Sequence, residues 1–287
     1  MFDQAEALRR KMEQRKLKET TSTKVVAVLS GKGGVGKSVF SLNFALGLNQ
    51  QNKKTLIIDL DIGMGNIDIL LGLHCQYNIV DMIEKQLSIE DVIAYHDSGL
   101  AVLTGGSGLT QLFHLDKDKF NFFLDQLNKL RNHFDVIIFD LGAGMNEDIL
   151  NFVKAVHEIL LVTTTEPTAL TDAYAAIKIA SLYANDIPIR VIVNRYDDEQ
   201  EVGETWTKLS NVTKRFLGRE LSFLGSLPRD TSVVKAVKSQ QPFIISSPRS
   251  KVSIHLNRIV STYLNEGNDQ NKPTMESFIT KLKRLFR

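Results

Sequence analysis

One short segment constrains the fold of this 287-residue chain more than any other feature. It follows the apolar run Val25–Ser30 and matches G-x-x-x-x-G-K-[ST], the pattern of a phosphate-binding loop between a strand and a helix. The glycines let consecutive backbone N–H groups face phosphate oxygens, and the next helix adds its positive N-terminal end. Lys37 can reach the β- and γ-phosphates, and the Ser38 hydroxyl suits Mg²⁺. The residues expected to bind the nucleotide phosphates are Gly31, Lys32, Gly33, Gly34, Val35, Gly36, Lys37 and Ser38.

Apolar runs alternate with helix-period segments over residues 24–264. The runs are rich in Val, Ile and Leu with little alternation, as expected for parallel strands that are covered on both faces. Repeated strand–helix–strand order predicts a doubly wound α/β domain with a mainly parallel sheet, of the P-loop NTPase type. The expected strands are Val25–Ser30, Thr55–Asp59, Leu100–Leu103, Asp135–Asp140, Glu158–Val162, Ile189–Val193 and Leu221–Gly225. The clearest expected helices are Ser41–Asn49, Lys117–Asn132, Leu170–Tyr183 and Glu201–Phe216.

Composition excludes several other classes of protein. Lys and Arg number 35 against 33 Asp and Glu, and the net charge of +2 argues against a protein that coats nucleic acid. The lone Cys75 cannot supply a disulfide framework or the paired cysteines of zinc-ribbon and iron–sulfur sites. No stretch approaches the ~20 apolar residues of a spanning helix, and the N-terminus is too charged for a secretory signal. The sequence therefore predicts a cytoplasmic protein.

Three aspartates end or directly follow strands that should border the phosphate loop. Asp59 and Asp61 lie at the end of the second expected strand, and Asp140 ends the strand that begins at Asp135. A carboxylate at the C-terminal end of such a strand can hold metal-bound water or orient an attacking water. A single strand-end aspartate is equally typical of a turn. Three of them in register with a phosphate loop favour metal and water chemistry.

Lys32 adds a second lysine at the start of the loop, and the form KGGVGKS resembles the deviant Walker A motif of the MinD/ParA class of ATPases. The segment from Asp59 to Asn66 is similar to the first switch of that class, D-x-D-x-G-x-x-N, and Asp140 to its Walker B aspartate. The resemblance implies ATP and Mg²⁺ as cofactors, slow and partner-modulated hydrolysis, and a homodimer that encloses two nucleotides. Locally, Lys32 is equally typical of a solvated lysine.

The resemblance also implies a role for each polar residue. Lys32 would reach the nucleotide of the partner subunit, Lys37 would neutralise phosphate charge, and Asp61 would position the hydrolytic water, so these three are the catalytic candidates. The implied magnesium site consists of Ser38, Asp59 and Asp140.

Two further segments are candidates for a base pocket. The strand Val191–Val193 leads into Asn194 and Arg195, and Pro228 and Asp230 follow the last expected strand. An asparagine offers a donor and an acceptor to adenine. Without a family match these segments are equally typical of turns. Both resemble the adenine-contacting loops V-x-N-R and P-x-D of the MinD family, which implies that they enclose the base.

The C-terminus predicts a linker over residues 265–273 and an amphipathic helix over residues 274–287. At 100° per residue the large apolar side chains fall within an arc of about 120°, with basic residues outside it. Such a helix suits an anionic membrane surface, and it resembles the MinD membrane-targeting tail; a helix docked on its own domain is the alternative. One tail should bind a membrane only marginally, whereas the two tails of an ATP-bound dimer gain by avidity. We therefore expect ATP to control membrane attachment. The residues expected at the membrane are Phe278, Ile279, Leu282, Lys283, Leu285 and Phe286.

Residues 1–23 form a polar leader in which a short helix begins near Asp3. A segment of this size is marginal as an isolated helix, and a disordered tail is the alternative. Its sequence resembles the signature D-Q-A-x-x-L-R of the flagellar MinD-type ATPases, the FlhG (or YlxH) group. That resemblance implies a role in flagellar number and placement, activation of the SRP-type GTPase FlhF, and contact with C-ring proteins. The matching residues are Asp3, Gln4, Ala5, Leu8 and Arg9.

Two other functions share the same nucleotide chemistry. A ParA-type DNA-segregation ATPase would bind DNA through basic stretches such as Lys235–Lys238, but the net charge of +2 and the hydrophobic tail disfavour it, and no specific nucleic acid is expected. A MinD-type division-site regulator differs in its partner, and the leader separates it from the flagellar group. Nitrogenase-type reductases and cluster-assembly ATPases need cysteines that Cys75 alone cannot supply.

Overall fold

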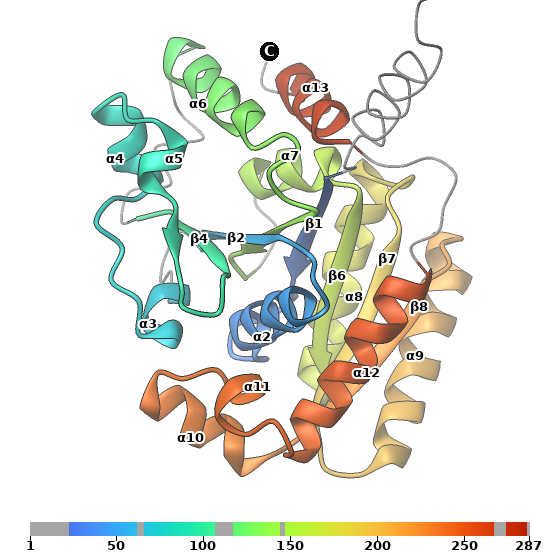
Figure 1. The fold of residues 1–287 in the computed structure, drawn as a ribbon. Coiled ribbons are helices and arrows are strands. Elements are labelled where there is room, and N and C mark those ends of the chain that lie inside the picture. Colours follow the sequence, from blue (N-terminus) through green and yellow to red (C-terminus); the bar gives the residue numbers. More distant parts are fainter. Residues whose placement is uncertain (1–22, 62–65, 107–116, 144–146, 267–273, 286–287) are drawn as a thin grey trace, which may run out of the picture.

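The computed structural model describes residues 23–61, 66–106, 117–143, 147–266 and 274–285. Within these ranges one sheet has the strand order β3-β4-β2-β5-β1-β6-β7-β8, and all neighbours except β3 and β4 pair in parallel (Figure 1). This confirms the predicted doubly wound, mainly parallel α/β fold. The strands are β1 (Lys24–Leu29), β2 (Thr55–Leu60), β3 (Ala94–Tyr95), β4 (Ala101–Thr104), β5 (Val136–Leu141), β6 (Glu158–Thr164), β7 (Ile189–Tyr196) and β8 (Ser222–Pro228).

All the strands expected from the sequence are present with small shifts at their ends, and the four expected helices correspond to α2, α6, α8 and α9. The strand β3 was not expected, because two residues are too few to show a period. The helices are α2 (Lys37–Gln50), α3 (Ile67–Leu71), α4 (Ile79–Glu84), α5 (Ile89–Val92), α6 (Lys117–Lys129), α7 (Glu147–Ala155), α8 (Pro167–Tyr183), α9 (Glu199–Leu217), α10 (Thr231–Ser239), α11 (Phe243–Ser246), α12 (Lys251–Glu266) and α13 (Met275–Leu285).

Helices cover both faces of the sheet, which explains why its central strands are apolar throughout. Val25 and Ala27 of β1 pack with helices α4–α9 and α13 on one face, whereas Val26 and Val28 pack with α2, α3 and α10–α12 on the other. In Figure 1, α2 and α12 lie in front of the sheet and α8 lies behind it. Every residue of β2, β5 and β6 is buried. A sheet buried on both sides is the arrangement that continuous Val, Ile and Leu runs favour.

The register of the central strands assembles the polar site. Asp59 of β2 pairs in register with Asp140 of β5, and Asp140 pairs with Val28 of β1. The phosphate loop leaves β1 just beyond this point and enters α2 at Lys37. Because parallel strands end at the same edge of the sheet, the loop and both carboxylates lie together.

The C-terminal helix α13 is docked on the domain, contrary to its expected place as a separate segment. Met275, Phe278 and Leu282 are buried in the same core as the sheet, and Ile279 and Leu285 pack against that core. The helix contacts α6, α7 and β1. The apolar side that was expected to face lipid is therefore covered by protein in this conformation. This agrees with the alternative expectation of a helix docked on its own domain.

One aromatic contact ties α13 to the central sheet. The ring of Phe278 stacks on Phe139 of β5 with centroids 5.4 Å apart, and Arg131 forms an ion pair of 3.0 Å with Glu276 at the start of the helix. The preceding helix α12 continues to Glu266, past the expected domain end at residue 264. Of the other expected features, most of the leader, the remainder of the linker and Phe286 lie outside the described residues.

None of the helices in the described residues combines the length and apolar composition needed to cross a bilayer.

Replacing Phe278 by Ala is expected to lower the free energy of unfolding by about 3–5 kcal/mol, because a fully buried ring is lost and a cavity forms beside Phe139. Urea denaturation followed by circular dichroism measures this. Thr280, which is exposed on the same helix, provides the control, and T280A should change stability by about 0.5 kcal/mol or less. Equal effects of the two substitutions would contradict the docked position of α13.

Candidate functional site

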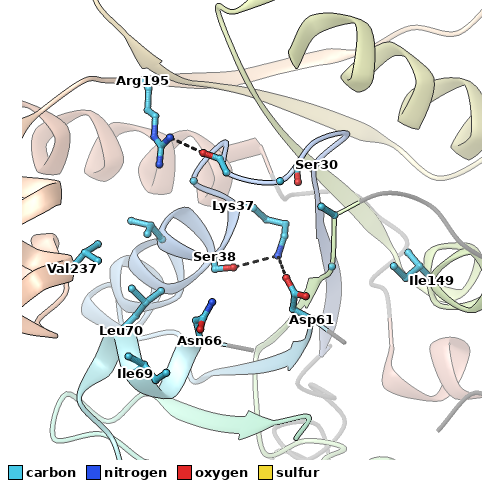
Figure 2. Close-up of a pocket in the computed structure, with 16 residues that line it drawn as sticks. Ser30, Lys37, Ser38, Asp61, Asn66, Ile69, Leu70, Ile149, Arg195 and Val237 are labelled. Carbon is cyan, nitrogen blue, oxygen red and sulfur yellow. Dashed lines mark hydrogen bonds and ion pairs between the residues drawn. The ribbon is translucent and has the colours of Figure 1, made fainter. Parts of the chain in front are cut away.

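The side chain of Lys37 lies at the centre of the site and is buried. Its Nζ is 2.9 Å from Oδ1 of Asp140 and 3.9 Å from Oδ2 of Asp61, and it donates a hydrogen bond of 3.3 Å to Ser38 Oγ. Figure 2 shows this ammonium group between Ser38 and Asp61, facing the pocket. Gly36, with φ of 91°, forms the left-handed turn that starts α2 and brings Lys37 there.

Asp140 is the buried acidic partner of this lysine, with no exposed surface. Its Oδ1 also accepts a hydrogen bond of 2.7 Å from Ser41 Oγ, one turn further along α2. Its other oxygen, Oδ2, is buried and has no hydrogen-bond partner among the described residues. A buried carboxylate oxygen without a partner is costly, and a cation or an ordered water in reach of it removes that cost.

Asp59 accepts hydrogen bonds from backbone groups on both sides of residues 62–65. Its Oδ1 accepts from the backbone N–H of Asp61, and its Oδ2 accepts from those of Asn66 and Ile67, at 2.9–3.2 Å. Burial and the neighbouring charge of Asp140 raise the pKa of Asp59 to about 6, while the N–H groups of Asp61 and Ile67 and the charge of Lys37 oppose the rise. Two buried carboxylates side by side thus create an electrostatic preference for a bound cation.

The donor set fits Mg²⁺. Ser38 Oγ, Asp59 and Asp140 supply hard oxygen atoms, and Mg²⁺ commonly uses only one or two carboxylates beside phosphates and water. The unpaired Oδ2 of Asp140 is the observation that favours this assignment. No group of three or more His, Cys, Asp and Glu side chains is arranged to hold a metal in the described part of the chain.

The start of the phosphate loop is fixed by α8. A Cβ on Gly31 would lie 2.1 Å from the backbone carbonyl of Asp172, so only glycine allows this contact. Lys32 donates a hydrogen bond of 3.2 Å to Thr168 Oγ1 and lies 3.6 Å from Oε2 of Glu166. Lys32 thus contacts its own α8 in this conformation.

Asn194 and Arg195 contact the phosphate loop itself. Asn194 Nδ2 donates to the carbonyl oxygen of Val35 at 2.8 Å, and Arg195 Nη1 donates to that of Gly34 at 2.6 Å. Arg195 has φ of 59°, a left-handed conformation that orients its side chain back toward the loop (Figure 2). These residues brace the loop in addition to lining the cavity predicted for the base.

Two adjoining cavities are lined by the residues predicted to bind the phosphates and the base. The first, of about 730 Å³, is lined by the phosphate loop, by Asp61 and Asn66, and by Gly142 and Ala143 after β5. The second, of about 300 Å³, is lined by Asn194, Pro228 and Asp230 among others, and the two share Gly36, Val39 and Arg195. Asp230 caps α10 by accepting from Ser232 N–H and also accepts from Val252 N–H. The structure therefore brings the predicted phosphate, metal and base residues together.

Comparisons with known proteins agree with this geometry. A family model described as "ParA: NUBPL iron-transfer P-loop NTPase" matches residues 21–264. The chain belongs to the ParA/MinD family of P-loop NTPases. It is 36% identical to antiactivator FleN of Pseudomonas aeruginosa over 80% of this chain and 82% of that protein. It is 31% identical to flagellum site-determining protein YlxH of Helicobacter pylori over 83% of this chain and 81% of that protein.

The fold is shared with solved members of the ParA/MinD family. The MinC:MinD cell division protein complex of Aquifex aeolicus superposes with a TM-score of 0.71, at 23% identity, over 87% of this chain and 99% of the matched chain. The predicted membership of the MinD/ParA class, with similarity to the flagellar group, is thus confirmed. Members of this family are ATPases. The matched description names iron transfer, but Cys75 is the only cysteine of this chain.

Sequence reasoning missed two parts of this ParA/MinD site. Ser41 lies four residues after Lys37 on α2, and this spacing places both on one helix face, a signal that could have identified it as a partner of Asp140. Glu166 and Thr168, the neighbours of Lys32, begin α8 more than a hundred residues away. No local pattern links them to the loop.

Substituting Gly31 by Ala is expected to weaken ATP binding about tenfold or more, because the added Cβ forces the loop away from α8. Isothermal titration calorimetry with ATP and Mg²⁺ measures this. Gly203 in α9 is the matched control, since a Cβ there meets nothing within 4 Å. G203A should keep wild-type affinity and stabilise the fold by about 0.5–1 kcal/mol. Wild-type affinity in G31A would refute the assigned contact.

Proposed function

We propose that this protein is an ATP-hydrolysing molecular switch that forms a dimer with ATP and regulates the number and placement of flagella. The buried pair of Lys37 and Asp140 beneath a complete phosphate loop is the observation that carries the ATPase part. Similarity to antiactivator FleN and to flagellum site-determining protein YlxH supports the flagellar part. The similarity to these two flagellar proteins favours this function over a DNA-segregation or division-site role.

Catalysis in this proposal consists of positioning and charge stabilisation. Lys37 turns from Asp140 and Asp61 toward the β- and γ-phosphates, whose charge it neutralises. Asp61, whose side chain is 28% exposed at the cavity, orients the attacking water. Ser38, Asp59 and Asp140 would hold Mg²⁺, which supplies charge neutralisation at the phosphates. The hydrogen bonds from Asn194 and Arg195 to carbonyl oxygens of the loop keep the loop rigid during this step.

Dimerisation requires a rearrangement of Lys32. Its ammonium group must leave Thr168 and Glu166 before it reaches a nucleotide on a second copy of the chain. Both Lys32 and Glu166 are exposed, so their ion pair is worth at most about 1 kcal/mol. A triphosphate provides a far stronger partner for the lysine. The contact with α8 is therefore an easily broken resting position.

Membrane attachment in this proposal uses α13 after it leaves the domain. The exposed Lys283 and Arg284 face solvent in the docked helix and would meet anionic lipid, while Phe278 and Leu282 would enter the bilayer surface. The ATP-bound dimer presents two such helices and gains by avidity. Sedimentation with anionic liposomes tests this step, since equal binding in ADP and in ATP would contradict it.

The proposed partners rest on the resemblance of the leader to the flagellar MinD-type group. The leader residues Asp3 to Arg9 would activate the SRP-type GTPase FlhF, and other surfaces would contact flagellar C-ring proteins. The protein would be cytoplasmic with peripheral attachment to the inner face of the cell membrane in its ATP state.

Asp61→Ala is expected to trap the ATP-bound dimer, because nucleotide still binds but the attacking water is no longer oriented. Size-exclusion chromatography with light scattering should show a dimer in ATP and Mg²⁺ and a monomer in ADP. Asp97→Ala, at an exposed position away from the cavity, is the control. It should convert between monomer and dimer as the wild-type protein does. A persistently monomeric D61A would refute the proposed dimer.

A peptide of residues 1–23 is expected to raise GTP hydrolysis by FlhF several-fold, since the leader would dock through one short helix. The same peptide with Leu8→Ala serves as its control and should lose most of this effect, because Leu8 is the largest apolar residue on that helix side. GTP turnover in a phosphate-release assay is the measurement. If the native peptide does not stimulate GTP hydrolysis, FlhF is not the partner of the leader.

A further inference from the structure

His157 connects α13 to the edge of the sheet opposite the nucleotide site. It lies between α7 and β6, and its ring is largely enclosed by β1 and the first turn of α13. Its Nδ1 accepts a hydrogen bond of 2.9 Å from the backbone N–H of Val25, and its Nε2 lies 2.8 Å from Ser277 Oγ. The ATPase chemistry uses none of these groups.

The direction of each hydrogen bond is fixed by elementary chemistry. A backbone N–H can only donate, so Nδ1 of His157 carries no proton and Nε2 carries the single ring hydrogen. Nε2–H therefore donates to Ser277 Oγ, and the Ser277 hydroxyl donates onward to the carbonyl oxygen of Thr274 at 2.7 Å. A proton added to Nδ1 removes the acceptor of the Val25 N–H and places two donors face to face.

The charged groups around His157 also oppose a second proton. Lys24 approaches from β1 and Lys281 from α13, and Lys24 is paired at 2.6 Å with Glu158 of β6. Lys281 lies 4.0 Å from Asp186, a distant and exposed partner. Burial, then Lys281 and Lys24, lower the pKa of His157 to about 4, with a small opposing effect from the Thr274 backbone.

We propose that His157 is a proton-sensitive latch: its neutral ring holds α13 on the domain, and its protonation releases the helix. The proton comes from solvent and adds to Nδ1. The hydrogen bond from Val25 is lost, and the imidazolium ring repels Lys281 on the helix. Release exposes the ring to water, where its charge is solvated. The latch concerns docking alone and does not require that the released helix binds lipid.

The pH dependence of docking follows from the difference between the pKa values of His157 in the docked and released states. Histidine in water has a pKa of about 6.5, whereas the docked value is about 4, so protons favour the released state. The full contribution to docking is present above pH 6.5 and is lost as the pH falls toward 4. The ratio of released to docked helix should thus rise about tenfold between pH 7.5 and pH 5.5.

Electron–electron distance measurements on the full chain test the latch without lipid. Spin labels on Asp125→Cys in α6 and Lys283→Cys in α13, in a Cys75→Ser background, report docked and released distances; both labelled positions are exposed. The ratio of released to docked helix should rise about tenfold from pH 7.5 to pH 5.5. His157→Asn, which offers Val25 an acceptor and cannot titrate, should abolish this rise. His133→Asn, at an exposed histidine, should retain it.

A rise of the same size in H157N, or no rise in the wild-type chain, would overturn the latch. Because H157N could itself loosen α13, nitrogen NMR of ¹⁵N-histidine protein provides a second readout that needs no variant. The His157 ring should be in the Nε2–H form at pH 7.5 and titrate below pH 5. A midpoint near pH 6.5 or an Nδ1–H ring would also overturn it. The liposome experiment can fail whether or not these two results are obtained. The latch and the membrane proposal can therefore be refuted separately.

Discussion

The buried ion pair between Lys37 and Asp140 is the contact on which the rest of the site depends. It joins the first residue of α2 to the end of β5, and it places a full positive charge under the phosphate loop. Breaking a buried pair by removing one partner typically costs about 3–5 kcal/mol, because the remaining charge is left uncompensated. Ser41 donates a hydrogen bond to Asp140, and burial together with the charge of Asp140 raises the pKa of the neighbouring Asp59. In the proposed mechanism a nucleotide draws Lys37 away from Asp140, and Mg²⁺ held by Ser38, Asp59 and Asp140 would replace the positive charge that Asp140 loses.

The strand β5 connects this site to the C-terminal helix. Asp140 faces the phosphate loop, while the preceding residue, Phe139, stacks on Phe278 of α13 from the other face of the sheet. Adjacent residues of a strand point to opposite faces, so one strand contacts both the nucleotide cavity and the docked helix. His157 contacts Ser277, the residue before Phe278, in the first turn of the same helix. The nucleotide cavity and the docked helix thus lie against opposite faces of the same strand.

Much of the fold and of the phosphate site could be predicted from the sequence, because both rest on local signals. The loop from Gly31 to Ser38 and the strand-end aspartates Asp59 and Asp140 are contiguous patterns, and parallel topology brings them to one edge. The docking of α13 could not be predicted, since an amphipathic helix looks the same whether a bilayer or Phe139 covers it. The contacts of Lys32 with Glu166 and of Asn194 with the loop join distant segments, and nothing local encodes them.

The central claim is that Lys32 of one subunit acts on the nucleotide of the other, and mixing two inactive variants tests it most directly. Lys32→Ala lacks the lysine in question, and Asp61→Ala lacks the water-orienting carboxylate. In a mixed dimer, the nucleotide on the K32A subunit retains its own Asp61 and meets the D61A subunit's intact Lys32. The account predicts that ATP hydrolysis reappears on mixing, toward one working site per mixed dimer. Hydrolysis that stays at the level of the separate variants, in mixtures shown to form mixed dimers, would contradict it.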